Sequence, residues 1–330
     1  MHAHGREKSA PREKILAARE QVGLFALHMT GREMKILLTG PTGFVGSAFI
    51  QEALRQSHQV AGLVIPSESI PAHLPTSNDL LWLRGTLTEA PWDQIKAFAP
   101  DVCLHTAWIT TPGIYLESPE NEKFRDGSRS FLQRVQELGT NYIFSLGTCV
   151  EYQISNHPLS EENTPVAPTT LYARCKDELR VAMEAEANSR GFGFCWGRVF
   201  YPYGPREHPS RLCSSIIDKL KRDEKIVLRT PQSTKDYIYI EDLATALLTV
   251  LDKRYTGIIN LGTGIGLSVR EIARALGEKL GKPQLIEEIN PPQIDPLGYV
   301  VADATRLRSL GWNPAHDLNQ GLQKLLAAKS

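Results

Sequence analysis

The sequence lacks the features that would mark a membrane, secreted or metal-binding protein. No apolar run among its 330 residues approaches the roughly 18 residues of a membrane-spanning helix. The first residues also lack the apolar segment of a secretory signal. The five cysteines are widely scattered and form no C-x-x-C pair, which argues against a disulfide framework or zinc site. We therefore expect a cytoplasmic protein with no membrane partner and no metal.

Net charge is absent as well, because 37 Lys and Arg residues balance 37 Asp and Glu residues. A broad nucleic-acid surface needs excess positive charge, so we expect no nucleic-acid partner. The chain does have length and a hydrophobic share of 42%, which suit two domains or one large α/β unit with an appendage. Residues 1–33 carry many charges, and we expect a flexible leader there; the alternative is a helix docked on the body.

From residue 34 onward, strand-like and helix-like patterns alternate. Short apolar runs indicate buried strands, and stretches with apolar residues on one face indicate amphipathic helices. This alternation predicts an α/β fold built on a doubly wound parallel sheet, the Rossmann architecture. The expected strands are 35–39, 59–65, 80–83, 101–106, 141–146 and 192–199, and the expected helices are 44–57, 92–98, 121–138 and 172–189.

Beyond Tyr201 the alternation loosens, and Pro, Gly and short helices dominate. We expect a smaller C-terminal substrate-binding lobe there, closing over the carboxyl ends of the strands, where open α/β sheets bind ligands. A pair of strands is expected near residues 225–228 and 236–239. The predicted division gives 34–200 plus 235–263 to the Rossmann part and 201–234 plus 264–330 to the lobe.

A glycine-rich loop joins the first predicted strand to the first predicted helix. Gly40, Gly43 and Gly46 follow the spacing G-x-x-G-x-x-G. The first glycine permits a tight turn, the second lets a pyrophosphate approach the backbone, and the third lets helix and strand pack closely. The helix N-terminus then offers N–H groups and a positive dipole end to phosphates. The loop therefore predicts that a dinucleotide, NAD or NADP, binds here.

The choice between NAD and NADP stays open at this stage. Val64 stands at the end of the second predicted strand, where an acidic residue would hold the ribose of NAD. Glu68 lies beyond a proline, and no arginine is nearby to meet the 2′-phosphate of NADP.

A tyrosine and a lysine, Tyr172 and Lys176, lie four residues apart on a predicted helix. Residues at that spacing share one helix face. A nearby ammonium stabilises a phenolate, so we expect Lys176 to lower the pKa of Tyr172. Tyr172 would then serve as general acid or base on an alcohol or carbonyl. Thr148, at the end of the fifth predicted strand, would hydrogen-bond the same substrate oxygen.

Together these motifs resemble the extended short-chain dehydrogenase/reductases of the nucleotide-sugar epimerase/dehydratase group. The resemblance runs from Lys35 to about Leu325 and includes several further motifs. These are His105-Thr-Ala-Trp108, Gly147-Thr-Cys-Val-Glu-Tyr152, Gly197-Arg-Val-Phe-Tyr-Pro-Tyr-Gly-Pro205, Lys235-Asp-Tyr-Ile-Tyr-Ile-Glu-Asp242 and Asn260-Leu-Gly-Thr-Gly264.

The resemblance implies hydride exchange between a nicotinamide and a sugar carbon, usually C4 of an NDP-hexose. It implies catalytic roles for Thr148, Tyr172 and Lys176, and a homodimer formed through the helices at 121–138 and 172–189. The implied cofactor-binding residues are Gly40, Thr42, Gly43, Phe44, Val45, Gly46, Thr86, Leu87, Thr106, Ala107, Trp108, Tyr172, Lys176 and Val199. The implied substrate-binding residues are Thr110, Thr148, Tyr172, Tyr201, Arg206, Arg211 and Lys235.

One departure from the family pattern concerns the reaction. The family's dehydratases carry an Asp-Glu pair directly after the catalytic threonine, whereas this chain has Cys149 and Val150. Neither side chain transfers protons well, so we do not expect a 4,6-dehydratase.

Other departures concern the substrate pocket. Family epimerases usually show Asn where this chain has Tyr201 and Arg where it has Lys235. A second phosphate-binding arginine is missing near residues 290–296, so we expect Arg206 and Arg211 to bind the pyrophosphate. We expect 4-keto reduction or 4-epimerisation of an NDP-(deoxy)hexose. The alternatives are a reductase of a non-nucleotide carbonyl compound and a non-catalytic dinucleotide-binding protein.

Overall fold

Residues 33–329 are described from a computed structural model of the chain. The leader expected at residues 1–33 lies, except for Glu33, outside this part of the chain. From Met34 onward the chain forms one compact unit. No helix within residues 33–329 is both long enough and apolar enough to cross a membrane.

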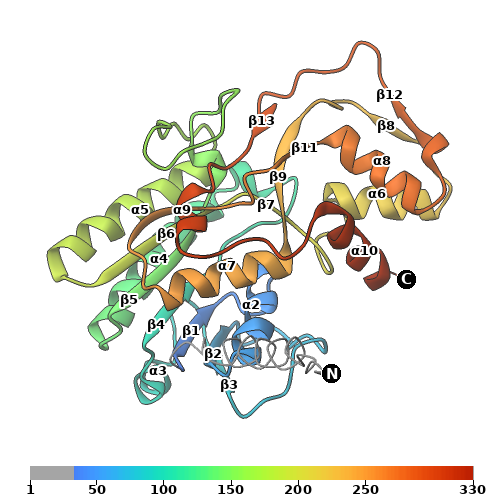
Figure 1. Cartoon of the computed structure of the whole chain (residues 1–330). Helices are drawn as coiled ribbons and strands as arrows, with labels where there is room; N and C mark the ends of the chain where they lie inside the picture. The colour runs from blue at the N-terminus through green and yellow to red at the C-terminus, as the bar shows by residue number, and fades with distance from the viewer. Residues whose placement is uncertain (1–32, 330) are drawn as a thin grey trace, which may run out of the picture. The chain divides into compact units, whose positions relative to one another are not determined.

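The centre of this unit is a parallel sheet of seven strands in the order β10-β6-β5-β4-β1-β2-β3 (Figure 1). The chain winds outward from β1 in both directions, so the predicted doubly wound α/β sheet is confirmed. The strands are β1 (Lys35–Thr39), β2 (Gln59–Val64), β3 (Leu80–Arg84), β4 (Val102–His105), β5 (Tyr142–Thr148), β6 (Gly193–Val199) and β10 (Gly257–Leu261).

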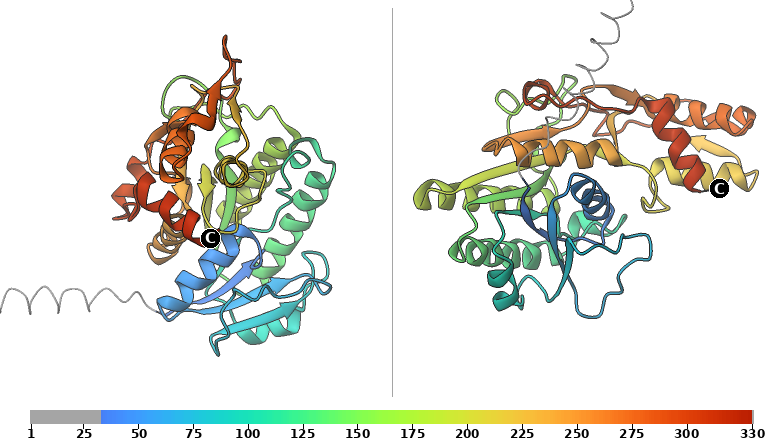
Figure 2. Two further views of the ribbon diagram at one scale, coloured as in Figure 1. Left: turned by 90° about the vertical axis from the view of Figure 1, so that its right-hand side faces the viewer. Right: turned by 60° about the horizontal axis from the view of Figure 1, so that its bottom comes forward.

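Helices cover both faces of this sheet (Figure 2). Ile36 and Leu38 of β1 belong to a hydrophobic cluster with α2 and α7, whereas Leu37 belongs to another cluster with α4 and α5. This split follows from the strand itself, because successive side chains point to opposite faces. The helices are α2 (Phe44–Arg55), α3 (Trp92–Phe98), α4 (Glu120–Glu137), α5 (Leu171–Arg190) and α7 (Ile240–Asp252).

The remaining elements form two small sheets and short helices, gathered in the upper right of Figure 1 apart from β7, β13 and α9. Their core is continuous with one face of the central sheet, because Ile217 of α6 and Leu276 of α8 join the cluster of α2 and α7. The strands are β7 (Tyr201–Tyr203), β8 (Ile226–Leu228), β9 (Thr234–Tyr239), β11 (Gly266–Ser268), β12 (Ile286–Glu288) and β13 (Tyr299–Val300), and the helices are α6 (Leu212–Lys221), α8 (Val269–Lys279), α9 (Thr305–Ser309) and α10 (Leu318–Ala328).

The expected pairing of strands near 225–228 and 236–239 is wrong. Both strands form, but β8 pairs with β12, and β9 pairs with β7, β11 and β13. A strand of three residues such as β8 carries too little pattern to indicate its partner. The sequence assigns residues 235–239 to the Rossmann part, which binds NAD(P), but they lie in the four-stranded sheet of β7, β9, β11 and β13. The division of the chain into lobes stays a prediction.

Candidate active site

The glycine loop lies at the carboxyl end of β1 and fits a pyrophosphate. Gly40 has a φ of +67°, in the left-handed region that glycine tolerates. A Cβ on Gly46 would lie 2.1 Å from the Gly40 carbonyl oxygen, so α2 packs directly on the loop. No side chain caps α2, whose N-cap is Gly43. The helix therefore presents its first N–H groups and its positive dipole end at the loop.

Tyr172 and Lys176 lie in the first two turns of α5. The helix starts here because the Thr170 side chain accepts a hydrogen bond from the Ala173 N–H, at 3.2 Å. Both side chains are buried, with exposed fractions of 8% for Tyr172 and 2% for Lys176. Thr148 ends β5, so it reaches the same region from the sheet.

The pKa of Tyr172 is shifted in the opposite direction from that expected. Burial raises it, the neighbouring Tyr115 and Glu151 add to the rise, and a hydrogen bond with the Thr148 hydroxyl opposes it. The expected lowering by Lys176 is absent because this ammonium is directed elsewhere. Its Nζ donates to the Leu146 carbonyl at 2.7 Å and lies 3.8 Å from the centroid of the Trp108 ring.

The pKa of Lys176 falls to about 7. Burial is the cause, and the negative charge of Glu151 opposes it. An amine with a pKa near neutrality exchanges protons readily at physiological pH, which suits a group beside an acid/base residue.

One cleft brings together the glycine loop, the three catalytic candidates and part of the substrate set. From the cofactor set it is lined by Gly40, Gly43, Phe44, Val45, Gly46, Thr106, Ala107, Trp108, Tyr172, Lys176 and Val199, and from the substrate set by Thr110, Thr148, Tyr201 and Arg211.

Three residues of the expected cofactor set do not line this cleft. The Thr42 hydroxyl donates to the Glu68 carboxylate at 2.6 Å. Thr86 accepts a hydrogen bond from the Glu89 N–H at 2.9 Å, and Leu87 packs against the hydrophobic cluster of α4 and α5.

Two cations of the expected substrate set also lie outside the cleft. Arg206 lines a separate hollow with residues of α2 and α7. Lys235 is buried, and its Nζ donates to Ser233 Oγ at 2.8 Å, to Asp295 Oδ2 at 3.0 Å and to the Leu297 carbonyl. These partners occupy all three N–H bonds of the ammonium.

The charges left in the cleft are few. Lys176 and Arg211 are the only cationic side chains among the residues that line it, and no carboxylate lines it. In the whole of residues 33–329, no group of three or more His, Cys, Asp or Glu side chains could hold a metal ion.

Tyr115 is a cleft residue that is missing from the predicted set. It lies in the short 3-10 helix η1 (Tyr115–Glu117), and its ring is nearly perpendicular to that of Tyr172 at a centroid distance of 4.9 Å. The only signal for it in the sequence is an aromatic residue in the segment after β4, because no motif surrounds it.

The surroundings of Glu68 also differ from expectation. Arg84 ends β3, next to β2 in the sheet, and donates to the Glu68 carbonyl at 2.5 Å. An arginine therefore lies near this loop, contrary to what the sequence indicated. The two residues come together because parallel pairing places the ends of β2 and β3 side by side.

Comparisons with known proteins agree on one family and fold. The model of the NAD dependent epimerase/dehydratase family matches residues 36–262. A UDP-glucose 4-epimerase of Streptomyces lividans is 27% identical over 312 residues, covering 85% of this chain and 92% of that protein. A dTDP-4-dehydro-6-deoxyglucose reductase of Escherichia coli is 23% identical over 317 residues, covering 90% of this chain and 98% of that protein.

A solved structure supports the fold. The UDP-glucose 4-epimerase of Thermus thermophilus in complex with NAD matches with a TM-score of 0.76 at 21% identity, covering 89% of this chain and 98% of that one.

Proposed function

Because the chain belongs to the NAD-dependent epimerase/dehydratase family, we propose that it transfers hydride between NAD(P) and a nucleotide sugar. The reaction is 4-keto reduction or 4-epimerisation of an NDP-(deoxy)hexose. The observation that carries this proposal is the meeting of Thr148, Tyr172 and Lys176 in the cleft that begins at the glycine loop. The relatives named above include enzymes of both reactions.

The chain's own residues supply proton transfer and orientation. The Tyr172 hydroxyl, raised in pKa by burial, remains protonated and is suited to donate its proton to the oxygen of a carbonyl being reduced. Thr148 lines the same cleft as Tyr172 and offers a hydroxyl to the same substrate oxygen. When bound, the nicotinamide supplies or accepts the hydride.

Dehydration does not suit this cleft. Cys149 lines it directly after Thr148, and burial raises the pKa of its thiol to about 12. Val150 has no proton to give. With no carboxylate on the cleft wall, the acid and base that water elimination requires are missing there.

We also propose that NAD is preferred over NADP. The Glu68 carboxylate is bonded to Thr42 inside the glycine loop, close to where the adenosine ribose of a dinucleotide lies in this architecture. A carboxylate accepts ribose hydroxyls but repels a 2′-phosphate. Arg84 is the opposing group, yet its guanidinium is held by the Glu68 carbonyl.

A second candidate function follows from the small number of cations. Lys235 is bonded to Asp295, and Arg206 lies outside the cleft, so Arg211 is the one cation left for a substrate diphosphate among the lining residues. This favours a less charged substrate, and the alternative is therefore a reductase of a non-nucleotide carbonyl compound.

The proposal also covers the cellular location of the protein and its assembly. All five cysteines are buried and unpaired, in keeping with a reducing cytoplasm. We infer a homodimer through α4 and α5, whose exposed side chains include Val181, 51% exposed.

The first prediction tests the acid/base role. Purified protein is expected to oxidise NADH with dTDP-4-dehydro-6-deoxyglucose, or to interconvert UDP-glucose and UDP-galactose with NAD. Tyr172→Phe is expected to lower turnover about 10²–10⁴-fold, because general acid–base catalysis contributes on that order. NAD binding, measured by calorimetry, stays unchanged.

The matched control is Tyr255→Phe, which removes a hydroxyl bonded to the Ile258 carbonyl, away from the cleft lining. It is expected to leave turnover unchanged.

Full activity of Tyr172→Phe would refute the role of Tyr172 as acid or base. Turnover of simple ketones but of no nucleotide sugar by the wild-type protein would favour the second candidate function. A preference for NADPH over NADH would contradict the NAD assignment.

A further inference from the structure

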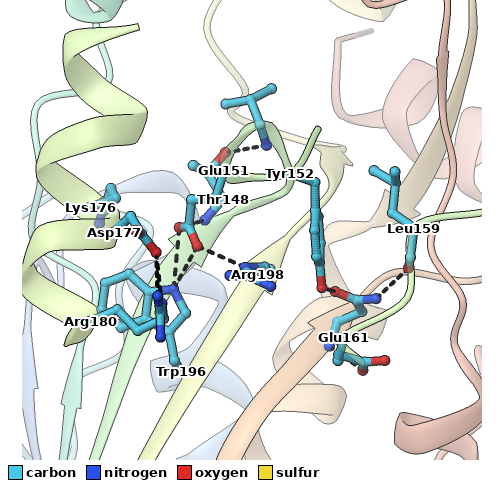
Figure 3. A network of polar contacts seen from close by, with 12 residues as sticks. Thr148, Glu151, Tyr152, Leu159, Glu161, Lys176, Asp177, Arg180, Trp196 and Arg198 are labelled. Atoms are coloured by element: carbon cyan, nitrogen blue, oxygen red, sulfur yellow. Dashed lines mark hydrogen bonds and ion pairs between the residues drawn. The ribbon is translucent and has the colours of Figure 1, made fainter. Parts of the chain in front are cut away.

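A buried charged network lies directly behind Thr148 (Figure 3). Its centre is the ion pair between Glu151 Oε2 and Arg198 Nε, at 2.7 Å, with side-chain exposed fractions of 0% and 1%. Neither residue lines the cleft. Glu151 therefore lies outside the cleft wall and acts on the cleft through a neighbour.

That neighbour is Thr148. Glu151 Oε1 accepts a hydrogen bond from the Thr148 N–H at 2.8 Å, while the Thr148 hydroxyl accepts a longer one from the Val150 N–H at 3.4 Å. These reciprocal bonds form a capping box where β5 ends and the 3-10 helix η2 (Cys149–Glu151) begins. The carboxylate thus holds the backbone from which the Thr148 hydroxyl projects.

The carboxylate itself is held from β6. Trp196 donates its indole N–H to Glu151 at 3.0 Å, and Arg198 donates from Nε. The Arg198 guanidinium lies 4.1 Å from the centroid of the Tyr152 ring, and the Tyr152 hydroxyl donates to Asn260 at 2.8 Å. Glu151 is thereby fixed by side chains from β6, which is itself locked between β5 and β10.

The end of β5 has a shape that admits this carboxylate. A Cβ at Gly147 would lie 2.5 Å from Glu151 Oε1 and 2.1 Å from Trp196 Nε1. Any side chain at that position would displace both groups, so the glycine permits their approach to the strand.

Stability alone is a poor reason for such a network. Desolvation of a buried ion pair offsets its attraction, and apolar residues of similar size are often as stabilising. Arg198 Nη2 is moreover buried without a hydrogen-bond partner among the described residues. A polar group in that state is a net loss for folding, which points to a role other than stability.

We propose that Glu151 is a positioning residue, which fixes the Thr148 hydroxyl beside Tyr172 through the Thr148 backbone, while Arg198 offsets the charge of Glu151. The proposal rests on the proposed function in so far as Thr148 takes part in the reaction. Its mechanism is geometric, because a displacement of about 1 Å at a reacting group lowers a rate by as much as about 10²-fold.

The test compares two double variants that both remove the ion pair. Glu151→Gln with Arg198→Met keeps an oxygen that accepts from the Thr148 N–H. Glu151→Met with Arg198→Met removes the acceptor. Neither leaves a buried charge unpaired, so both are expected to fold, as monitored by circular dichroism and thermal melting.

The expected result is a split between the two variants. The Met/Met variant loses about 10- to 100-fold in kcat, with KM and the affinity for NAD within about twofold of wild type. The Gln/Met variant retains most of its kcat. In a Thr148→Ala background the Met/Met change has no further effect, because groups that act as one unit are not additive. Equal kcat in both double variants, or a full additional loss in the Thr148→Ala background, would overturn the proposal.

A second readout keeps this outcome distinct from failure of the proposed function. Hydrogen exchange of residues 146–152 needs no substrate, and it is expected to be faster in the Met/Met variant but near wild type in the Gln/Met variant. Unchanged exchange in both would overturn the positioning role even if wild type turns over nucleotide sugars. Faster hydrogen exchange in the Met/Met variant, together with no turnover by the wild-type protein, would refute the proposed function but leave the positioning role in place.

Discussion

At the scale of single residues, the buried ammonium of Lys176 makes stability depend on pH. Its pKa is lowered from 10.5 to about 7 in the folded protein. Between those values the unfolded chain binds more protons than the folded one, so the Lys176 contribution to stability rises with pH in that window. Lys176→Met removes this contribution. We expect it to raise the melting temperature by several degrees at pH 6–7, with the gain shrinking toward pH 10.

Lys123→Met is the matched control for this prediction, because the Lys123 side chain is 75% exposed on α4. Its effect on the melting temperature is expected to be small and constant over the same pH range. A gain for Lys176→Met that is equally large at pH 7 and pH 10 would contradict the lowered pKa.

Single-residue roles could be predicted where they depend on local spacing. Tyr172 and Lys176 share a helix face whatever surrounds them, and both line the cleft with Thr148. The environment of each residue could not be predicted. Lys235 meets Asp295 only because the segment before β13 folds onto β9. The pKa of Tyr172 rises because the side chain is buried and the Lys176 ammonium is directed to Leu146 and Trp108.

At the scale of elements, the close packing of α2 on the glycine loop depends on Gly46, and Gly127 of α4 is a helical glycine without such a contact. A Cβ at Gly46 would lie 2.1 Å from the Gly40 carbonyl oxygen, whereas at Gly127 of α4 the nearest atom would be 3.6 Å away. Gly46→Ala must push α2 off the loop, so we expect lower stability and at least about tenfold weaker NAD binding, corresponding to roughly 1.4 kcal/mol. Calorimetric titration with NAD measures the affinity.

Gly127→Ala serves as the control. It has room for the methyl group, and alanine is favoured over glycine in a helix by up to about 1 kcal/mol. We expect unchanged NAD affinity and equal or higher stability. Wild-type affinity in Gly46→Ala would show that the loop does not bind the cofactor through this contact.

Six of the seven strands of the central sheet could be predicted closely because each carries a full pattern of its own, whereas β10 was not predicted. The expected strand 35–39 and helix 92–98 coincide with β1 and α3, and the other expected strands and helices up to β6 differ only at their ends. Pairing beyond β6 could not be predicted. β8 and β12 are three residues each and are separated in the chain by six other elements, from β9 to the 3-10 helix η3 (Pro283–Leu285), so nothing local indicates that they meet.

At the scale of the whole molecule, the proposed dimer would place a charged surface at its centre. Arg125 forms an ion pair with Glu178 at 2.5 Å, and Arg129 forms one with Glu186 at 3.1 Å. Within one chain, these ion pairs link α4 to α5 across their exposed side. Charges on such a face are screened by salt, since the Debye length falls from about 10 Å at 0.1 M to about 3 Å at 1 M. An apolar interface would instead persist at high salt.

These pairs lie within one chain, and we expect the same charged side chains to meet those of the second protomer. The dissociation constant of the dimer is therefore expected to rise with salt, by roughly 10-fold between 0.05 and 1 M NaCl, as measured by sedimentation equilibrium. Glu178→Arg puts like charges beside Arg125 and is expected to shift the protein toward monomer at low salt. Glu287→Arg, on the distant β12, is the matched control and leaves the dimer intact. A monomer at every salt concentration would refute assembly through α4 and α5, and a dimer insensitive to both salt and Glu178→Arg would assign the interface to another surface.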